Sequence, residues 1–303
     1  MKLQQSAFSQ AGTLLKGNLH THTTRSDGAL SPEETIQIYE DKGFDFLALT
    51  DHRLYNRQPA PQGSRVLLLP GMELDATVPD APVHCLHLVS IGSDTQNGFQ
   101  QDQTFRSERV TQLSDAQHWI DEILAANNLL IVCHPEWSGM GYSEVSALQR
   151  FGLMEIWNSG CALDCMLDRN AAYWDELLND GRIVYGVATD DCHAVSHMGV
   201  GAVYVRAEKT TESIVEALRT GAFYASCGPK IDDFYVEDGE AHIRCSEAAC
   251  IRFRHFRWPA HVCTGTGLTE ASVRLPESIR YIRAEVYDAQ GRCAWTNPIF
   301  LDR

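Results

Sequence analysis

The chain of 303 residues lacks any run of about 18 apolar residues, which is the length that a membrane-spanning helix needs. Its first twenty residues lack the apolar core and cleavage site of a secretory signal. None of its ten cysteines forms a Cys-x-x-Cys pair, so the spacing of a zinc ribbon is missing as well. From these absences we predict a cytoplasmic protein without a membrane span, whose cysteines are buried thiols.

Positive charge is also scarce. Lys and Arg number 25 against 40 Asp and Glu, which gives a formal net charge of −15. Binding to duplex nucleic acid depends on clustered positive charge that releases counterions. The composition therefore argues against a duplex partner, although bound metal ions could still attract a small anion. The oligomeric state is left open.

Short apolar runs alternate with helical patterns from residue 15 to about residue 227. The runs are 15–22, 44–51, 66–73, 87–91, 129–134, 153–158, 183–190 and 200–205. A capping box at Ser31, with Pro32 at the first helical position, predicts a helix that ends at Gly43, and further helices are expected over 107–127 and 211–220. Strands that alternate with helices predict an α/β fold with a parallel sheet, either open or closed into a barrel.

The pattern changes after Gly228-Pro229. The segments 231–236, 241–245, 251–256, 272–275 and 281–287 resemble strands, with turns such as Asp238-Gly239 between them. We therefore predict two domains, at 15–228 and 229–303, the second a small antiparallel β domain. Its histidines at 242, 255 and 261 have no carboxylate at ligand spacing and are not expected to bind metal.

Polar side chains stand at or just after the ends of successive apolar runs. His20 and His22 have the i, i+2 spacing that puts two imidazoles on one face of a strand, and Asp27 follows in Ser-Asp-Gly. The others are His52 after Asp51, Glu73, His84 and His87, His134, and Asp191 and His193 after Asp190. Imidazoles and carboxylates gathered at one end of a sheet would repel each other or lack partners without a cation. The pattern therefore predicts a site for more than one metal ion.

The order of these motifs carries a family resemblance. His-x-His, Ser-Asp-Gly, Thr-Asp-His, Gly-x-Glu, His, Cys-His-Pro and Asp-x-His together resemble the polymerase and histidinol phosphatase (PHP) superfamily over residues 17 to about 228. The segments 222–229 and 294–300 look like the branch that includes carbaryl-hydrolase-like metallohydrolases. The resemblance implies a distorted seven-stranded β/α barrel that holds up to three divalent ions.

The resemblance also implies a ligand set. One metal would be bound by His20, His22, Glu73 and Asp191, a second by the bridging Glu73 with His87 and His134, and a third by Asp27, His52 and His193. His87 matches the family's pattern better than His84, and Asp191 has the Asp-x-His spacing that Asp190 lacks. Nitrogen and oxygen ligands without sulfur favour two or three ions of Mn²⁺, Fe²⁺ or Zn²⁺.

Five further residues are candidates for contact with the substrate, besides Glu73. Arg25 and Arg53 could bind a phosphate or a carboxylate in bidentate fashion, or could pair with surface acids. His197 could protonate a leaving group. Trp137 and Tyr142, which flank residues 138–141, could line the substrate site or merely pack.

These observations predict a metal-dependent hydrolase. We expect a phosphoesterase that acts on a small phosphorylated, anionic molecule through a hydroxide that bridges two ions. A non-phosphate ester or carbamate split at the same centre is the alternative, because only Arg25 and Arg53 supply obvious positive charge nearby. A non-catalytic module that metal ions stabilise is a third reading.

Overall fold

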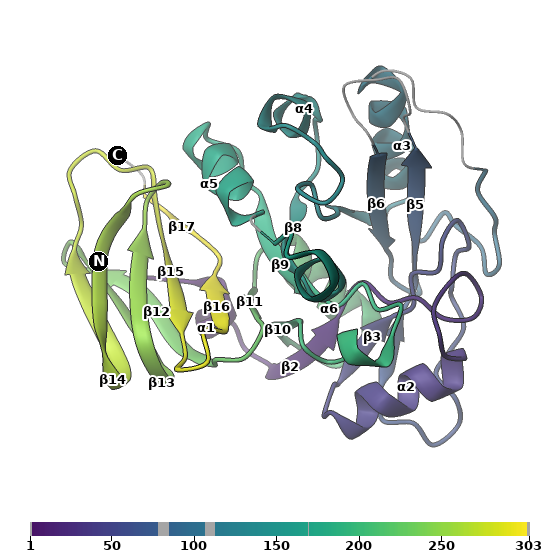
Figure 1. The fold of residues 1–303 in the computed structure, drawn as a ribbon, viewed down its shortest axis with the longest axis horizontal. Helices are drawn as coiled ribbons and strands as arrows, with labels where there is room; N and C mark the ends of the chain where they lie inside the picture. Colours follow the sequence, from purple (N-terminus) through teal and green to yellow (C-terminus); the bar gives the residue numbers. More distant parts are fainter. Residues whose placement is uncertain (1, 78–84, 107–112, 169, 302–303) are drawn as a thin grey trace.

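The computed structural model describes residues 2–77, 85–106, 113–168 and 170–301, and it has a mixed α/β fold (Figure 1). The described strands form two sheets. The smaller sheet has the order β5 (Gly71–Thr77), β6 (Cys85–Ile91), β7 (Leu129–Val132), β8 (Leu153–Asn158) and β9 (Tyr185–Thr189). The larger sheet begins with β4 (Leu67–Leu69), β3 (Phe46–Ala48), β2 (Thr13–Asn18), β10 (Ala202–Ala207) and β11 (Phe223–Ser226).

The larger sheet continues without a break into the C-terminal strands. These are β16 (Cys293–Thr296), β15 (Tyr281–Tyr287), β13 (Glu240–Arg254) and β12 (Ile231–Glu237), followed by β1 (Leu3–Gln4), with β14 (Pro259–Arg274) beside β13 and β17 (Ile299–Phe300) beside β15. In Figure 1 they form the left part of the molecule, and β5 and β6 lie at the opposite end. Because strands on both sides of residue 229 share this sheet, the two-domain division there stays a prediction.

The expected parallel pairing is present only in part. The β2–β3–β4 and β7–β8–β9 strands are parallel, but β5–β6–β7 and β2–β10–β11 are antiparallel. Seven residues separate β5 from β6, and a parallel connection needs a crossover of about a dozen or more. The uniformly parallel sheet was therefore a wrong expectation. The described ladders form two sheets and not one ring, so the seven-stranded barrel is not confirmed.

Local sequence signals explain the helices that were expected. In α2 (Pro32–Asp41) the Ser31 side chain accepts a hydrogen bond from the Glu34 amide at 3.3 Å, and the Glu34 carboxylate accepts one from the Ser31 amide at 2.9 Å. Gly43, at φ 73°, then takes the left-handed conformation that often ends a helix. The expected helices also include α3 (Leu113–Ala125) and α6 (Thr211–Arg219). Residues 107–112 of the range expected for α3 lie outside the described residues.

Several elements were not foreseen, among them a helix and a long strand. Helix α5 (Ala171–Asn179) lies between β8 and β9 in the chain, and the expected strand 241–245 and most of the expected strand 251–256 belong to one long strand, β13, which ends at Arg254. Ser246 and Glu247 lie in this strand where the β13–β14 register shifts, between Arg244 and Ala248. No helix within the described ranges is long and apolar enough to cross a membrane.

Burial of whole strands directs polar residues to the strand ends. Every residue of β3, β7 and β8 is buried, as are the last four of β9. Strands covered on both faces are largely apolar, so ionisable groups concentrate where the strand leaves the core. His52, His134 and Asp191 follow β3, β7 and β9 in this way.

Candidate metal centre

The structure brings the nine predicted ligands together. Ligand atoms within 4.8 Å of one another form the groups His20, His22, Glu73, Asp191; Glu73, His87, His134; and His22, Asp27, His52, His193. A further group joins His20 to Cys133 and Glu155. The three predicted sets are thus reproduced as neighbours, with His22 added to the third. His84 lies outside the described residues.

The first group is buried and held at short distances. His20 Nε2 and His22 Nε2 lie 3.2 Å apart. Each of these nitrogens lies 3.1–3.3 Å from both Glu73 Oε2 and Asp191 Oδ1. His20 Nδ1 lies 2.7 Å from a carboxylate oxygen of Glu155, which favours a proton on that nitrogen. A neutral His20 therefore turns the lone pair of its Nε2 toward the other three atoms.

Two oxygens of this group have no hydrogen-bond donor. Glu73 Oε2 and Asp191 Oδ1 are buried and accept no hydrogen bond among the described residues, although histidine nitrogens lie near them. Buried carboxylate oxygens are nearly always satisfied by a donor or a cation. Lone pairs of two carboxylates and two imidazoles that face one point are the donor set of a divalent transition metal. The residues present therefore fit a metal ion.

The second group uses the other oxygen of Glu73. Glu73 Oε1 lies 2.9 Å from His87 Nδ1 and 3.6 Å from His134 Nε2. Glu73 and His87 do not follow strand ends; they lie inside the antiparallel β5–β6 pair, where Asp75 stands opposite His87. Since alternate residues of a strand share a face, Glu73 and Asp75 point the same way. Glu73 thus offers one oxygen to each of two groups.

The third group is the most open. Asp27 lies 3.4 Å from His193 Nε2, 3.5 Å from His52 Nε2 and 3.6 Å from His22 Nδ1, and its side chain is 54% exposed. A Cβ atom on Gly28 would lie 2.4 Å from the His22 backbone, so glycine is required for the close approach of this loop. His22 faces the first group with one nitrogen and the third with the other.

The ionisation of these residues reflects the close contact of imidazoles with carboxylates. Burial alone would lower the pKa of His52, but hydrogen bonds to Asp27 and Asp75 raise it to about 10. Burial would also lower the pKa of His20. The negative charges of Asp191, Glu73 and Glu155 outweigh this effect and raise that pKa well above its usual value. Conversely, hydrogen bonds from His193 and His52 hold the pKa of Asp27 far below its usual range. The site strongly favours positive charge, in the form of protons or of metal ions.

Two ligand positions carry backbone strain. Asp191 has φ 47° and His134 has φ 25°, in the left-handed region that residues other than glycine seldom adopt. Such conformations persist where surrounding structure holds them, and they concentrate at functional sites. Both residues lie directly or almost directly after a buried strand, so the strain turns their side chains toward the cluster.

Glu155 is a site residue that the sequence patterns did not reveal. It is fully buried and accepts hydrogen bonds from the His134 amide at 2.9 Å, Thr189 Oγ1 at 2.6 Å and Asn158 Nδ2 at 2.9 Å. Asn158 Nδ2 also lies 3.1 Å from Asp191 Oδ2. Glu155 therefore positions several members of the first two groups. Its only signal was a charged residue inside the apolar run 153–158.

The other acidic neighbours have structural roles. Asp190 accepts hydrogen bonds from Tyr39 Oη, Ser159 Oγ and the Gly201 amide, each at 2.6 Å, so Asp191 and not Asp190 faces the cluster. Asp51 accepts hydrogen bonds from the Thr23 amide at 2.8 Å and Ser26 Oγ at 3.0 Å. Asp51 thereby fixes the loop that carries Asp27.

A cavity of about 400 Å³ opens onto the ligand cluster. Its described lining consists of Asp27, His52, Glu73, His87, His134, Trp137, Gly160, Cys161, Asp164, Cys165, Asp191, His193 and His197. Trp137 and His197 thus line the cavity as candidates for substrate contact, and His197 Nε2 lies 3.1 Å from Asp164. Tyr142 instead donates a hydrogen bond to Asp180 at 2.6 Å.

The two arginines lie elsewhere. Arg25 contacts Asn56 and Asp102, and Arg53 Nη1 lies 2.5 Å from Asp75. Neither arginine, and no lysine, is among the described residues that line the cavity. Both arginines therefore pair with acids of the chain, which was the second of the two expectations for them. His242, His255 and His261 belong to none of the candidate metal groups found in the described residues.

Known proteins resemble the chain in parts of its sequence. No protein-family model matches it. A stretch of 110 residues is 29% identical to the 5'-3' exoribonuclease Rnm of Salmonella typhimurium and covers 34% of this chain and 38% of that protein. A stretch of 41 residues is 46% identical to the DNA polymerase/3'-5' exonuclease PolX of Bacillus subtilis, covering 14% of this chain and 7% of that protein. The chain thus matches well under half the length of either relative.

The fold as a whole has a counterpart among solved structures. A two-domain protein of Bacteroides vulgatus that contains a predicted PHP-like metal-dependent phosphoesterase aligns with a TM-score of 0.51 and 16% identity. The alignment covers 96% of this chain and 98% of that protein. At 16% identity this alignment shows that the two proteins share a fold, which agrees with the fold that the family resemblance implied.

Proposed function

We propose that the chain is a metal-dependent hydrolase whose centre is the cluster of nine residues. The observation that carries the proposal is the pair of buried oxygens, Glu73 Oε2 and Asp191 Oδ1, that face two imidazole nitrogens without a hydrogen-bond donor. The shared fold and the predicted ligand order support it. We assign two or three ions of Mn²⁺, Fe²⁺ or Zn²⁺ to the three groups, with Glu73 between the first two.

The proposal extends to the architecture. The site residues are carried by or follow seven strands, β2, β3, β5, β6, β7, β8 and β9, which we assign to the distorted seven-stranded barrel of the family. We propose that residues 15–228 form this metallohydrolase unit and 229–303 the antiparallel β unit. The cytoplasmic location and the carbaryl-hydrolase-like branch stay predictions.

The chain's own residues would divide the work of hydrolysis. When bound, the metal ions would supply an activated water and polarise the ester. Glu155 holds His20 in one tautomer and orientation, as partners of metal-binding histidines do. His197, oriented by Asp164, lines the same cavity and can carry a proton to the leaving group.

The substrate that we favour is a small phosphoester. The cavity of about 400 Å³ has the size of small-molecule sites, which span about 300–1,000 Å³. The two curated relatives are named as nucleases, but the net charge of −15 and the absence of Lys and Arg from the described lining argue against a long polyanion here. The charge of a phosphoryl group would then be neutralised by the metal ions and not by arginine.

The same lining favours a second candidate. A neutral carbamate or carboxylate ester needs no basic side chain, and neither Arg25 nor Arg53 belongs to the described lining. The cleavage chemistry would be the same, and only the recognition of the substrate would differ.

A substrate screen on protein with a defined metal content separates these candidates. We expect turnover of small phosphomonoesters and competitive inhibition by inorganic phosphate, which presents the same oxygens. Turnover of carbamates or neutral esters without any phosphoester would establish the second candidate. No hydrolysis at full metal occupancy would favour a non-catalytic module.

A further inference from the structure

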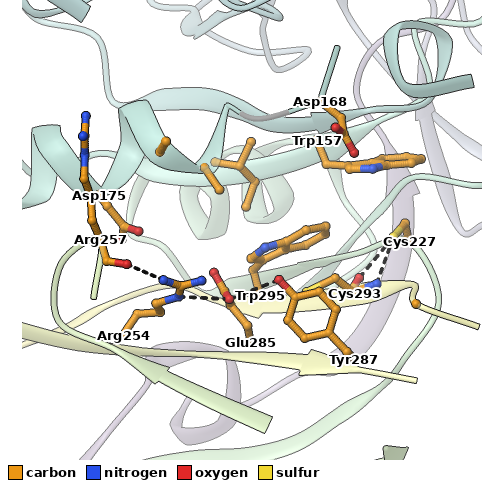
Figure 2. A pocket seen from close by; sticks show the side chains of 14 residues that line it. Trp157, Asp168, Asp175, Cys227, Arg254, Arg257, Glu285, Tyr287, Cys293 and Trp295 are labelled. Carbon is orange, nitrogen blue, oxygen red and sulfur yellow. Dashed lines mark hydrogen bonds and ion pairs between the residues drawn. The ribbon is translucent and has the colours of Figure 1, made fainter. Parts of the chain in front are cut away.

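A second cavity, of about 570 Å³, lies between the α/β part and the C-terminal strands (Figure 2). We call it the cleft. One wall comes from β8 and α5 and includes Trp157 and Asp175; the other comes from β13, β15 and β16 and includes Arg254, Glu285 and Trp295. It shares none of its described lining residues with the metal cavity. Its volume falls in the range of about 300–1,000 Å³ typical of small-molecule sites, which often lie between domains.

Two indole rings line the cleft from opposite walls. Trp157 is 9% exposed and Trp295 is 6% exposed, and Figure 2 shows one ring above the cleft and the other below it. Neither indole N–H donates a hydrogen bond to any described residue. A largely buried tryptophan usually finds an acceptor for this group. The cleft therefore presents two donors that a ligand could satisfy.

Two of the three carboxylates that line the cleft, Asp175 and Glu285, are already occupied, whereas the third, Asp168, is exposed. Both oxygens of Asp175 accept hydrogen bonds from Arg283, at 2.7 and 2.8 Å, and Arg283 also donates to Glu285 Oε1 at 2.9 Å. Glu285 Oε2 accepts a hydrogen bond from Arg254 Nε at 3.1 Å. These two acids thus have little capacity left to bind a cation.

Arg254, in contrast, keeps a free donor. Its Nη1 donates to the Arg257 carbonyl at 2.5 Å and its Nε to Glu285, but its Nη2 has no acceptor in the described part of the chain. Guanidinium groups have donors only, and they bind planar oxyanions well. The free hydrogen-bonding capacity of these inner residues therefore consists of donors, next to aromatic surface.

From this lining we propose that the cleft binds a planar aromatic ring that bears an anionic oxygen group. The ring would lie against Trp157 and Trp295, and the anionic group would accept hydrogen bonds from Arg254. A nucleoside monophosphate and an aromatic carboxylate share this chemistry. The site is separate from the metal centre, and its ligand does not depend on which ester is hydrolysed there.

The test measures binding to the full-length, metal-loaded protein by equilibrium dialysis. The probes are adenosine 5′-monophosphate, quantified as intact nucleotide, and indole-3-carboxylate, each in the presence of excess inorganic phosphate to occupy the metal cavity. A dissociation constant of about 1 mM or lower is expected for at least one probe. Binding of the nucleotide alone or of the carboxylate alone identifies the source of the anionic group.

Variants assign the binding to the cleft. Arg254→Gln should weaken it about tenfold, the effect of one charged hydrogen bond. Arg244→Gln is the matched control, because Arg244 lies on the same strand and pairs with the single acid Asp233 outside the cleft. Trp157→Phe keeps a ring but removes the N–H, and it should weaken binding several-fold.

Three outcomes would overturn the proposal. These are no binding of either probe up to about 10 mM, equal binding by wild type and both cleft variants, or a weakening by Arg244→Gln as large as that by Arg254→Gln. If Arg254→Gln lowers the thermal stability, the decision rests on Trp157→Phe.

Discussion

Two buried clusters of charge lie in this molecule, and they differ in how their hydrogen bonds are satisfied. Around Arg283, the guanidinium donates to Asp175 and Glu285, and Arg254 donates to the remaining oxygen of Glu285. Every carboxylate oxygen of these two acids has a donor. The carboxylates of this cluster are thus satisfied by protein groups alone, which is typical of a structural ion-pair network.

The metal cluster is incomplete with protein groups alone. Glu73 Oε2 and Asp191 Oδ1 accept no hydrogen bond from described residues, and the available positive charge comes from imidazoles. The comparison teaches that burial and charge do not by themselves mark a functional site. What distinguishes the metal cluster is that two donor-free carboxylate oxygens lie 3.1–3.3 Å from the same two imidazole nitrogens, an arrangement that a cation would satisfy.

Breaking the complete cluster should have the largest effect on stability. Arg283→Ala leaves Asp175 without its main partner in the interior, and removal of one member of a buried pair costs about 3–5 kcal/mol in the free energy of unfolding. Chemical denaturation measures this change. Arg244→Ala, which breaks a partly exposed pair, should cost no more than about 1 kcal/mol. An equal loss of unfolding free energy in the two variants would contradict the distinction between the buried cluster and the partly exposed pair.

Breaking the incomplete cluster should affect activity more than folding. His20→Ala and Asp191→Ala should each lower turnover by at least about two decades, because each removes a ligand of the first group. His242→Ala is the control, since that histidine belongs to no candidate metal group among the described residues. Wild-type turnover in either ligand variant, at measured metal content, would remove that residue from the site.

The pH dependence of stability should sharpen the comparison. In chelator-treated protein the pKa of His52 is raised to about 10, and those of His20 and His134 are raised as well. A histidine whose pKa rises on folding stabilises the protein fully below its unfolded pKa of about 6.5. That stabilisation is lost as the pH rises through the pKa that the histidine has in the folded protein.

The free energy of unfolding of the chelated protein should therefore fall between about pH 6.5 and 10. Metal-loaded protein should not show this decline, because its ligands are already deprotonated. On the acid side, the lowered pKa of Asp27 adds stability that is lost as pH falls. Denaturation midpoints across this range measure both effects, and identical profiles with and without metal would count against the assignment of these histidines.

The smallest effect is expected at the arginines. Arg25 is paired with Asp102 and lies outside the described lining of the cavity. Arg25→Ala should therefore change KM by less than about threefold, the scale of an exposed ion pair. An increase of tenfold or more, with weaker inhibition by phosphate, would show that Arg25 reaches the substrate.

The sequence predicted the members of the cluster better than their environment. His20, His52, His134 and Asp191 could be predicted because a buried strand forces such residues to its end. Glu73 and His87 were found as well, although they lie inside an antiparallel pair whose direction no local pattern specifies. Local signals also located α2, since a capping box acts within four residues.

Long-range partners outside the family's motifs could not be predicted. Glu155 looked like one residue of an apolar strand, and its role depends on His20, which is 135 positions away. The pairing of Arg25 with Asp102 spans 77 positions in the same way. Side-chain contacts of this range are fixed by tertiary packing, which the spacing of a single sequence does not encode.

Metal content tests the central claim most directly. Protein expressed with Mn²⁺, Fe²⁺ or Zn²⁺ and analysed for bound metal should carry two or three ions per chain. Glu73→Gln, which changes the residue shared by two groups, should lower that number by at least one. Fewer than one ion per chain in the wild type after supplementation would contradict the account.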